Sequence, residues 1–399
     1  MDNIRLTLVV VMLLSCLYQG VYAFLRLANV RRRYQEGKRC RYAVLIAARN
    51  EQAVIGQLLD SIRAQEYPRE LIDIFVAADN CTDSTALVAA AHGATVFERF
   101  DRSRVGKGYA LAFLIHKIWE GCPAGTYDGY FVFDADNLLD PRYVAEMDRV
   151  FSAGARVVTG CRNAKNFTDN WLTAGYGLYI LRESEFMNRP RDFLGTGCMV
   201  SGTGFLMAES LLREAGGWQW FSLSEDTEFS ADMAIRGEHI AYCPGAMLYD
   251  EQPADLKVSV TQRSRWIKGY LQVLMRHGPA LFSAWLRTGR FACYELLIGG
   301  IPAMVCGGIG FLLEPTPVAA LTGLVSAYLA VYLTGLLTLI IQWKTIRGPA
   351  RKKILYSFAY PVFMLTFLPA LVPAVFGKAQ WKCVPHTAAL SIQDLTGKT

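Results

Sequence analysis

Hydrophobic residues are densest near the two ends of the chain, whereas the part between them alternates between two shorter patterns. From residue 42 to residue 133, apolar runs of strand length are separated by segments with the spacing of amphipathic helices. Such repeated strand–helix units predict an α/β fold with a mostly parallel central sheet and helices on both faces. The expected strands are Tyr42–Ala48, Leu71–Ala77, Ala94–Phe97 and Tyr130–Phe133, and the expected helices are Ala53–Ala64, Ser84–Ala91, Lys107–Trp119 and Asn170–Met187.

The N-terminal apolar stretch, Leu6–Leu27, is about the length that a bilayer core requires. It is followed by a basic cluster that begins at Arg31, which predicts a cytoplasmic flank and an N-terminus outside. A cleaved signal peptide is the alternative, since Val21-Tyr22-Ala23 resembles a cleavage site. The positive charge, however, lies on the wrong side of the stretch for a signal peptide.

Three apolar segments near the other end, at about Leu296–Leu313, Val318–Ile341 and Ile354–Phe376, are predicted to span the membrane. Basic residues between Lys344 and Lys353 predict a cytoplasmic loop before the last of them. Prolines within that last segment indicate a kinked or re-entrant helix, which leaves the side of the C-terminal tail open.

These patterns divide the chain into five parts. We expect a transmembrane anchor at 1–28, a cytosolic catalytic domain at 40–270, an interfacial amphipathic helix at 271–289, transmembrane helices at 290–377 and a tail at 378–399. The predicted location is therefore the cell membrane, with several spans and a cytoplasmic catalytic domain.

Composition narrows the class of protein. Apolar residues make up 52% of the 399 residues, and the net charge of +6 arises mostly beside the apolar stretches. No basic stripe is interleaved with aromatic residues, so no nucleic-acid partner is expected. The ten cysteines form no C-x-x-C pair, which indicates a reducing compartment. The five histidines are never at zinc-site spacing, so zinc is not expected.

The chemistry is predicted around Asp134-Ala135-Asp136, which directly follows an apolar strand. In open α/β sheets, ligands bind at the carboxyl ends of the strands. Two carboxylates there suit Mg²⁺ or Mn²⁺ with a diphosphate completing the shell, although an ordinary Asx turn gives the same pattern. A dehydrogenase-type Rossmann domain is excluded, because Ala47-Ala48-Arg49-Asn50-Glu51 stands where a glycine-rich loop would be needed.

Three motifs in the second half of the domain have both a functional and a structural interpretation. Gly202-Thr203-Gly204 lets a ligand approach the backbone or forms a turn. Ser224-Glu225-Asp226 supplies a catalytic carboxylate or caps the helix that follows. Gln262-Arg263-Ser264-Arg265-Trp266 binds a substrate or anchors the chain at a membrane surface.

Taken together and in this order, these motifs resemble the membrane-integrated glycosyltransferases of family 2, which include cellulose, hyaluronan and poly-N-acetylglucosamine synthases. Two further elements contribute to the resemblance, Ala78-Asp79-Asn80-Cys81-Thr82-Asp83 and Gly106-Lys107-Gly108-Tyr109-Ala110-Leu111. The resemblance covers about Tyr42 to Trp266. It implies a GT-A-type nucleotide-sugar-binding domain with transmembrane helices.

The resemblance also implies a role for each matching position. The expected nucleotide-sugar-binding residues are Ala47, Arg49, Glu51, Asp79, Lys107, Asp134 and Arg265. The expected acceptor-binding residues are Gly202, Thr203, Gly204, Glu225, Gln262 and Trp266. Asp136 is the expected metal ligand and Asp226 the expected general base. A cation and Arg265 would stabilise the leaving diphosphate, while Asp226 would take the proton of the acceptor hydroxyl.

The expected function is therefore that of an inverting hexosyltransferase with a UDP-sugar donor and Mg²⁺ or Mn²⁺. The leading acceptor is a growing β-linked polysaccharide, and a single transfer to a lipid, giving a glycolipid, is the alternative. The expected partners include the lipid bilayer, with room left for accessory export subunits. A non-catalytic nucleotide-sugar sensor is a remote alternative, because fold alone does not prove activity.

Overall fold

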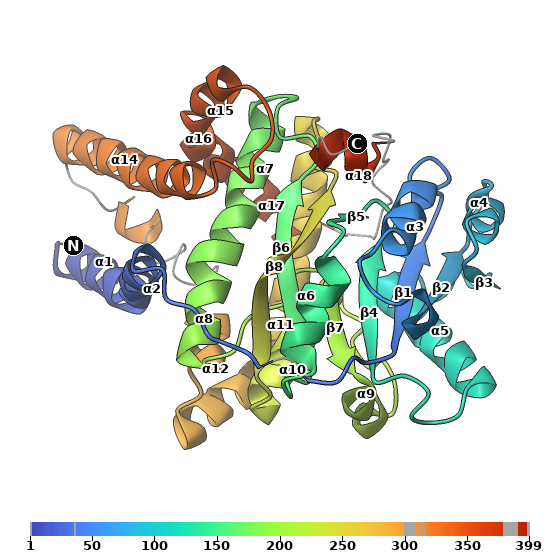
Figure 1. Ribbon diagram of the computed structural model, residues 1–399. Helices are drawn as coiled ribbons and strands as arrows, with labels where there is room; N and C mark the ends of the chain where they lie inside the picture. The colour runs from blue at the N-terminus through green and yellow to red at the C-terminus, as the bar shows by residue number, and fades with distance from the viewer. Residues whose placement is uncertain are drawn as a thin grey trace.

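An eight-stranded sheet crosses the described part of the molecule in the order β3-β2-β1-β4-β7-β6-β8-β5 (Figure 1). The structure is a computed structural model, and it describes residues 2–35, 37–298, 308–311, 313, 316–377 and 390–396. The four predicted strands are confirmed, with ends that differ by at most two residues. The strands are β1 (Tyr42–Ala48), β2 (Ile72–Asp79), β3 (Thr95–Arg99), β4 (Gly129–Asp134), β5 (Leu138–Leu139), β6 (Val157–Ala164), β7 (Phe205–Ala208) and β8 (Ile240–Asp250).

The sheet is mostly parallel, as predicted, but two of its strands run the other way. β1 pairs in parallel with β2 and β4, β2 with β3, and β6 with β8. β7 is antiparallel to β4 and β6, and β5 is antiparallel to β8. Since β2 and β4 lie on opposite sides of β1, the strand order reverses between β1 and β4. The carboxyl ends of strands at such a point flank the usual ligand crevice of an open α/β sheet.

Helices cover both faces of the sheet because successive side chains of a strand point to opposite faces. Ala43 and Leu45 belong to the core that includes Leu111 of α5, whereas Val44 and Ile46 belong to the core beneath α3 and α6. The helices of this region are α3 (Ile55–Arg63), α4 (Thr85–Ala91), α5 (Lys107–Gly121), α6 (Tyr143–Phe151), α7 (Trp171–Arg182), α8 (Arg189–Leu194), α9 (Glu209–Ala215) and α10 (Glu225–Arg236).

The helix predicted at Asn170–Met187 is confirmed in its first two thirds and then changes type. Asn170 caps α7, because its side chain accepts hydrogen bonds from the backbone N–H groups of Leu172 and Thr173. After α7 the chain forms a π-helix, η2 (Glu183–Asn188), before α8 begins. Short π-helices are rare and occur frequently at functional sites.

A single long helix, α11 (Leu256–Thr288), follows the sheet. The boundary that we expected between residues 270 and 271 falls inside it, because buried apolar residues continue through Ile267, Val273 and Leu281. Pro279 lies within the helix without ending it. The predicted interfacial segment is therefore the C-terminal half of the helix that also carries Gln262 and Trp266.

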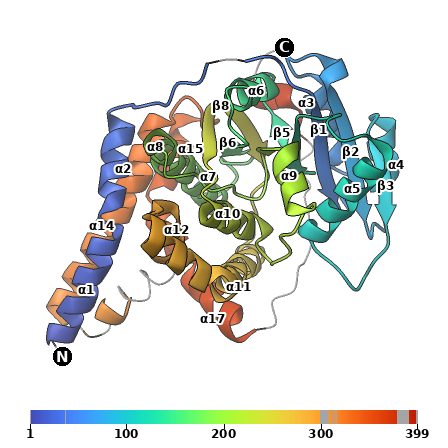
Figure 2. The ribbon, with the colours of Figure 1, turned by 90° about the horizontal axis from the view of Figure 1, so that it is seen from below.

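Within the described residues, two helical segments are long and apolar enough to cross a membrane, Leu6–Leu27 and Pro317–Ile341. The first comprises α1 (Asp2–Cys16) and α2 (Tyr18–Leu27), and the second is α14. They extend from the same side of the molecule (Figures 1 and 2). The proline-rich segment is bent by 50° between α15 (Ala350–Ser357) and the helices α16 (Tyr360–Leu365) and α17 (Leu368–Phe376), so it is a broken span or a re-entrant loop.

Further helices are the 3₁₀ helix η1 (Arg69–Leu71), α12 (Phe291–Ile298) and α18 (Ile392–Thr396). Most of the predicted span at Leu296–Leu313 lies outside the described residues, as does most of the predicted tail at 378–399.

Arg263 joins α11 to the bent segment. Its side chain is fully buried, and its guanidinium carbon lies 4.6, 4.1 and 4.4 Å from the ring centres of Tyr176, Phe363 and Phe367. Its Nε donates to the Tyr176 hydroxyl at 3.1 Å, and Nη1 donates to the Phe363 carbonyl at 3.3 Å. A desolvated cation among three aromatic rings is a strong contact, so α7, α11 and the bent segment are held together at this residue.

Candidate active site

A cleft of about 550 Å³ opens at the carboxyl ends of β1, β2 and β4, facing α10 and α11. It brings together most of the residues that the sequence predicted, including all three of Asp79, Asp136 and Asp226. The predicted residues that line it are Ala47, Arg49, Glu51, Asp79, Lys107, Asp134, Asp136, Gly202, Glu225, Asp226, Gln262, Arg265 and Trp266.

One end of the cleft is built around Asp79, the last residue of β2. Asp79 Oδ1 accepts hydrogen bonds from Arg99 Nη1 at 2.6 Å and from Asn80 Nδ2 at 2.9 Å. Asn80 and Asn50, which follow β2 and β1, adopt left-handed backbone conformations with φ of +53° and +58°. Asparagine tolerates this conformation better than most residues, so the chain turns sharply here and leaves the strand ends open to a ligand.

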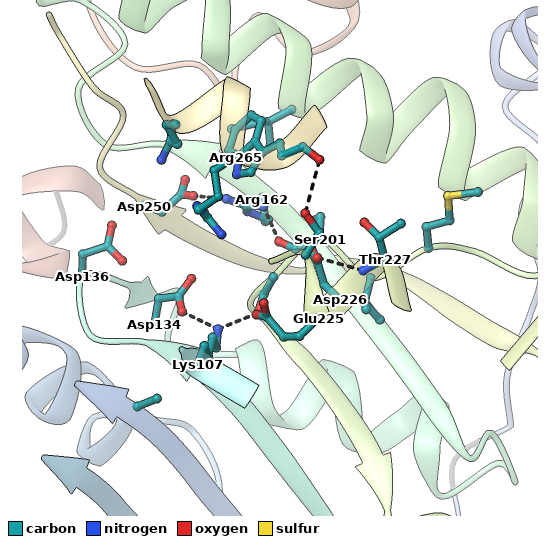
Figure 3. Close-up of a pocket in the computed structure, with 18 of the residues that line it drawn as sticks. Lys107, Asp134, Asp136, Arg162, Ser201, Glu225, Asp226, Thr227, Asp250 and Arg265 are labelled. Carbon is teal, nitrogen blue, oxygen red and sulfur yellow. Dashed lines mark hydrogen bonds and ion pairs between the residues drawn. The ribbon is translucent and has the colours of Figure 1, made fainter. Parts of the chain in front are cut away.

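Lys107 connects the first carboxylate of the Asp134-Ala135-Asp136 motif to the glycine motif. It lies at the first position of α5, where its ammonium forms an ion pair with Asp134 and donates to the Gly202 carbonyl at 2.7 Å (Figure 3). The Asp134 side chain stays 40% exposed, so it remains accessible from the cleft.

Asp136 is buried, in contrast to Asp134. Its Oδ2 accepts the Glu251 backbone N–H at 2.9 Å, and its Oδ1 accepts from Asn137 Nδ2 at 3.3 Å. These two donors fix the orientation of the carboxylate. A backbone β-turn is also present, because Asn137 N–H donates to the Asp134 carbonyl at 3.1 Å. The same short segment thus forms a turn and also presents an oriented carboxylate.

Glu225 and Asp226 form the first turn of α10 on the opposite wall of the cleft. Ser224 makes no side-chain capping bond, but Asp226 accepts a first-turn backbone N–H, so the motif serves the helix end as well as lining the cleft. Burial and the neighbouring Asp226 raise the pKa of Glu225 to about 7. Burial also raises the pKa of Asp226, against the opposing effect of the Thr227 N–H, which donates to its Oδ1 at 2.8 Å.

The residues of α11 line the cleft on the side where this helix contacts the bent segment. Gln262 accepts a hydrogen bond from the Tyr176 hydroxyl at 3.2 Å, and Trp266 packs edge-to-face with the Tyr176 ring at 6.1 Å. Arg265 Nη1 donates to the Leu223 carbonyl at 2.8 Å, next to the Ser224-Glu225-Asp226 motif. A cation, an amide and an aromatic ring from one helix thus reach the cleft together.

Thr203 and Gly204 are buried and are absent from the residues that line the cleft. Thr203 Oγ1 accepts the Asp134 N–H at 2.9 Å and donates to Asn137, so it supports the acidic motif from behind. Gly204 has a φ of +68°, and a Cβ there would lie 1.9 Å from Leu248 Cδ2. Both residues therefore serve backbone geometry and packing, and only Gly202 of the three lines the cleft.

The sequence did not indicate several polar residues that also line the cleft. Arg162 of β6 and Asp250 of β8 form an ion pair with each other, and Arg162 also donates to the Ser201 carbonyl (Figure 3). Glu183, Asn188 and Arg191 reach the cleft from η2 and α8. Asp250 follows an apolar strand just as Asp134 does, which is a signal that would have found it.

The mostly parallel sheet, with acidic residues after its central strands and a facing carboxylate on a helix, has the GT-A fold. Residues 39–269 match the family model described as "Glycosyltransferase like family 2". The chain belongs to this family and is a glycosyltransferase.

Similar curated proteins agree with this assignment. The chain is 27% identical over 244 residues to a probable glycosyltransferase, YdaM, of Bacillus subtilis, covering 59% of this chain and 56% of that protein. It is also 27% identical over 262 residues to the poly-beta-1,6-N-acetyl-D-glucosamine synthase of Staphylococcus aureus strain COL, covering 63% of this chain and 59% of that protein. The match thus spans somewhat more than half the length of these relatives.

Among solved structures, the mannosyltransferase PcManGT of Pyrobaculum calidifontis, in complex with GDP-Man and Mn²⁺, is similar with a TM-score of 0.58. The comparison covers 94% of this chain and 99% of that one at 16% identity, so it supports the fold alone.

Proposed function

We propose that this glycosyltransferase moves a sugar, with inversion, from a cytosolic UDP-sugar to a growing β-linked polysaccharide at a membrane. The observation that carries the proposal is the meeting of Asp79, Asp134 and Asp136 on one wall of the cleft with Asp226 on the other. This arrangement provides a place for a nucleotide diphosphate beside a carboxylate that faces the transferred sugar.

The donor nucleotide is proposed to lie along the ends of β1 and β2. Ala47, Arg49, Glu51 and Asp79 line this end of the cleft, and Arg99 holds Asp79 in place. Lys107 lies between this end and Asp134, where its ammonium is suited to diphosphate oxygens. Donor binding would then compete with the contacts that Lys107 makes to Asp134 and Gly202.

A divalent cation, Mg²⁺ or Mn²⁺, fits the acidic edge of the cleft. Asp136 and Asp134 offer hard oxygen ligands, and the Glu251 N–H and Asn137 amide orient Asp136. No group of three or more metal-binding side chains occurs within the described residues. That suits Mg²⁺, which is usually bound by one or two carboxylates together with substrate phosphates and water. When bound, the cation would supply electrostatic stabilisation of the leaving diphosphate.

Asp226 is proposed to be the general base. The acceptor hydroxyl is a weak nucleophile, and a carboxylate that removes its proton typically accelerates the reaction by about 10²–10⁴-fold. The raised pKa of Asp226 makes it a stronger base than an ordinary aspartate. Because Asp226 faces the donor wall, the acceptor oxygen attacks from the side opposite the diphosphate, which inverts the anomeric carbon.

Arg265 and Trp266 are proposed to act on the two substrates from α11. The guanidinium of Arg265 suits the oxygens of the departing diphosphate, while the Trp266 ring offers a flat apolar face to a sugar. Glu225 and Gln262 add hydrogen-bonding groups for the acceptor on either side of Asp226 and Trp266. Because α11 also contacts the bent apolar segment, the acceptor would pass from the cleft toward the membrane.

A membrane location and a polymeric product are supported by the two apolar helices and by the similarity to a polysaccharide synthase. The proposal places the catalytic domain in the cytoplasm, the chain across the bilayer several times, and the product in a path between its helices. Accessory export subunits would extend that path.

A single transfer to a lipid acceptor is the second candidate. It is favoured by the small number of spans, since the described residues contain two, or up to three if the bent pair is one span. A channel needs enough helices to surround a polymer, whereas a lipid acceptor needs only access from the bilayer.

The decisive experiment is a panel of radiolabelled UDP-sugars, with UDP-N-acetylglucosamine and UDP-glucose first, given to the purified protein in lipid nanodiscs with Mn²⁺. We expect label in material of high molecular mass that a β-specific glycosidase degrades. Label confined to the organic phase would favour the glycolipid. Binding of UDP without any transfer from any donor would favour a nucleotide-sugar sensor and overturn the proposal.

A further inference from the structure

Arg162 and Asp250 form a charged pair in the cleft to which neither the family motifs nor the proposed reaction gives a role. Arg162 lies on β6 and Asp250 ends β8, with side chains 18% and 6% exposed. Nη2 of Arg162 pairs with Asp250 Oδ2, and Nη1 donates to the carbonyl of Ser201. Figure 3 shows Arg162 between these two partners.

The segment Met199–Gly202, which we call the central segment, lines the middle of the cleft and is held from four elements. Arg162 of β6 and Lys107 of α5 bind the consecutive carbonyls of Ser201 and Gly202. Ser230 of α10 accepts the Val200 N–H at 3.2 Å, and Asn188 of η2 accepts the Met199 N–H at 3.2 Å. Both cations are also paired with acids, Arg162 with Asp250 and Lys107 with Asp134.

The central segment lies against the proposed base. Gly202 has a φ of +78°, and a Cβ built on it would be 3.7 Å from Asp226 Oδ2. Ser230, which holds Val200, also donates to the Asp226 carbonyl at 2.8 Å. A displacement of the central segment would therefore alter the space between Asp226 and the acidic edge, where the acceptor hydroxyl and the anomeric carbon must meet.

Arg162 is poorly placed to bind the diphosphate directly. Both of its terminal nitrogens are occupied, and its Nε is buried without a hydrogen-bond partner within the described residues. Arg265, by contrast, is only partly buried, and its Nη1 donates to the Leu223 carbonyl. Lys107, with its partners Asp134 and Gly202, already stands at the donor end.

We infer that Arg162, held by the buried Asp250, is a positioning residue that fixes the central segment against Asp226 and thereby aligns the acceptor for attack. This inference rests on the proposed function for its kinetic part. A guanidinium bridges two acceptors with a rigid planar fork, whereas a lysine ammonium at this site keeps the charge but loses the fork. The substitution Arg162→Lys therefore separates bridging from charge.

The test compares Arg162→Lys and Arg162→Met with Arg156→Met as the control. Arg156 precedes the same strand and bridges Glu214 and Glu238 at 2.6 Å each, but it lies outside the cleft. Arg162→Met leaves Asp250 buried without its cation, so the double variant Arg162→Met/Asp250→Asn is included to remove both charges. Thermal unfolding of each protein shows which variants fold.

Two readouts are needed, UDP affinity by calorimetry and kcat with donor KM for UDP-N-acetylglucosamine. Misplacement of about 1 Å can cost about 100-fold in rate, so we expect kcat to fall roughly 10- to 100-fold in Arg162→Lys, Arg162→Met and the double variant. UDP affinity and donor KM should stay near those of the wild type. A wild-type kcat in Arg162→Lys would show that charge suffices, and a parallel loss of UDP affinity would make Arg162 a donor ligand; either result overturns the inference.

Hydrogen–deuterium exchange of the intact protein gives a readout that needs no activity. The amide hydrogens of peptides covering residues 198–204 should exchange faster than in the wild type in all three cleft variants. Their exchange should be unchanged in Arg156→Met. Unchanged exchange in Arg162→Met would refute the inference. If the wild type binds UDP but transfers no sugar, the proposed function fails, while the exchange result still decides whether Arg162 fixes the central segment.

Discussion

Arg99 Nη1 lies 2.6 Å from Asp79 Oδ1, and both side chains are less than one tenth exposed. Arg99 also binds Asp101 at 3.0 Å and the Arg104 carbonyl at 2.8 Å, so it anchors the loop that precedes α5. The end of the cleft that we assign to the nucleotide is therefore shaped by an arginine that does not itself line the cleft.

Arg99→Met should destabilise the protein and weaken UDP binding together, because it leaves the Asp79 carboxylate buried without its cation. Breaking a buried ion pair by removing one partner costs about 3–5 kcal/mol. Urea unfolding and UDP calorimetry measure the two effects. Arg142→Met is the control, since Arg142 is 65% exposed and its contact with Asp140 is 4.0 Å long. A UDP affinity that survives Arg99→Met would remove Asp79 from the nucleotide site.

Asp226→Asn should abolish turnover while nucleotide binding is retained. The amide keeps the shape of the side chain but cannot accept the proton of the acceptor hydroxyl, and loss of a general base typically costs about 10²–10⁴-fold in rate. Single-turnover transfer and UDP calorimetry separate the two properties. Asp232→Asn on the same helix, where Asp232 pairs with Arg236, should remain active. Turnover by Asp226→Asn at the wild-type rate would mean that the base is another residue.

Glu225 should make stability depend on pH, because its folded pKa of about 7 lies above the ordinary value of 4.5. Between these values the folded protein holds a proton that the unfolded chain has released. Stability therefore falls as pH rises through this window, and the destabilising effect is complete above about pH 7.

Glu225→Gln carries a neutral side chain at every pH and should remove this effect. At 1.36 kcal/mol per pKa unit, the variant should gain up to about 3 kcal/mol over the wild type at pH 8, with little gain near pH 4. Urea unfolding at both values measures it. Glu214→Gln, at a surface position that is 57% exposed, is the control. An equal effect of Glu225→Gln at both pH values would show that Glu225 titrates normally.

Asp136→Asn should weaken the binding of Mn²⁺ in the presence of UDP. Loss of even an outer-shell partner costs metal sites about 10–100-fold in affinity, so loss of a ligand should cost at least about 10-fold. Electron paramagnetic resonance of free Mn²⁺ measures binding without reference to activity. Asp140→Asn, four residues further on, is the matched control because Asp140 bonds the Arg142 N–H instead of facing the cleft. Equal Mn²⁺ affinity in the two variants would exclude Asp136 as the ligand.

The first half of the fold was predictable because short apolar runs alternate with helical spacing there. Pro68 marks the turn before β2 and Asp134 ends the apolar run of β4, and β1 to β4 were predicted almost to the residue. The antiparallel strand β7 has no such signal, since the direction of a strand depends on contacts with β4 and β6 that are distant in sequence. The π-helix at η2 likewise has no local signal, since no glycine or proline separates it from the end of α7.

The residues of the candidate site likewise fall into those that the sequence predicted and those that it did not. Residues within short motifs, such as Lys107 and Asp226, reach the cleft as predicted. Thr203 and Gly204 belong to a motif but turn into the protein, because Gly204 must pack beneath Leu248. Arg162 was missed because its importance comes from Asp250, 88 residues away, and no pattern along the chain links the two.

Arg263, enclosed by Tyr176, Phe363 and Phe367, lies between Gln262 and Trp266 on one helix. In the membrane-embedded enzyme that we propose, the bent segment cannot change its depth without moving the two residues that face the sugar. Lipid acyl-chain length then becomes a determinant of catalytic rate, transmitted through one enclosed guanidinium. The same lipids should have less influence on an Arg263→Met enzyme, in which helix and bent segment are uncoupled.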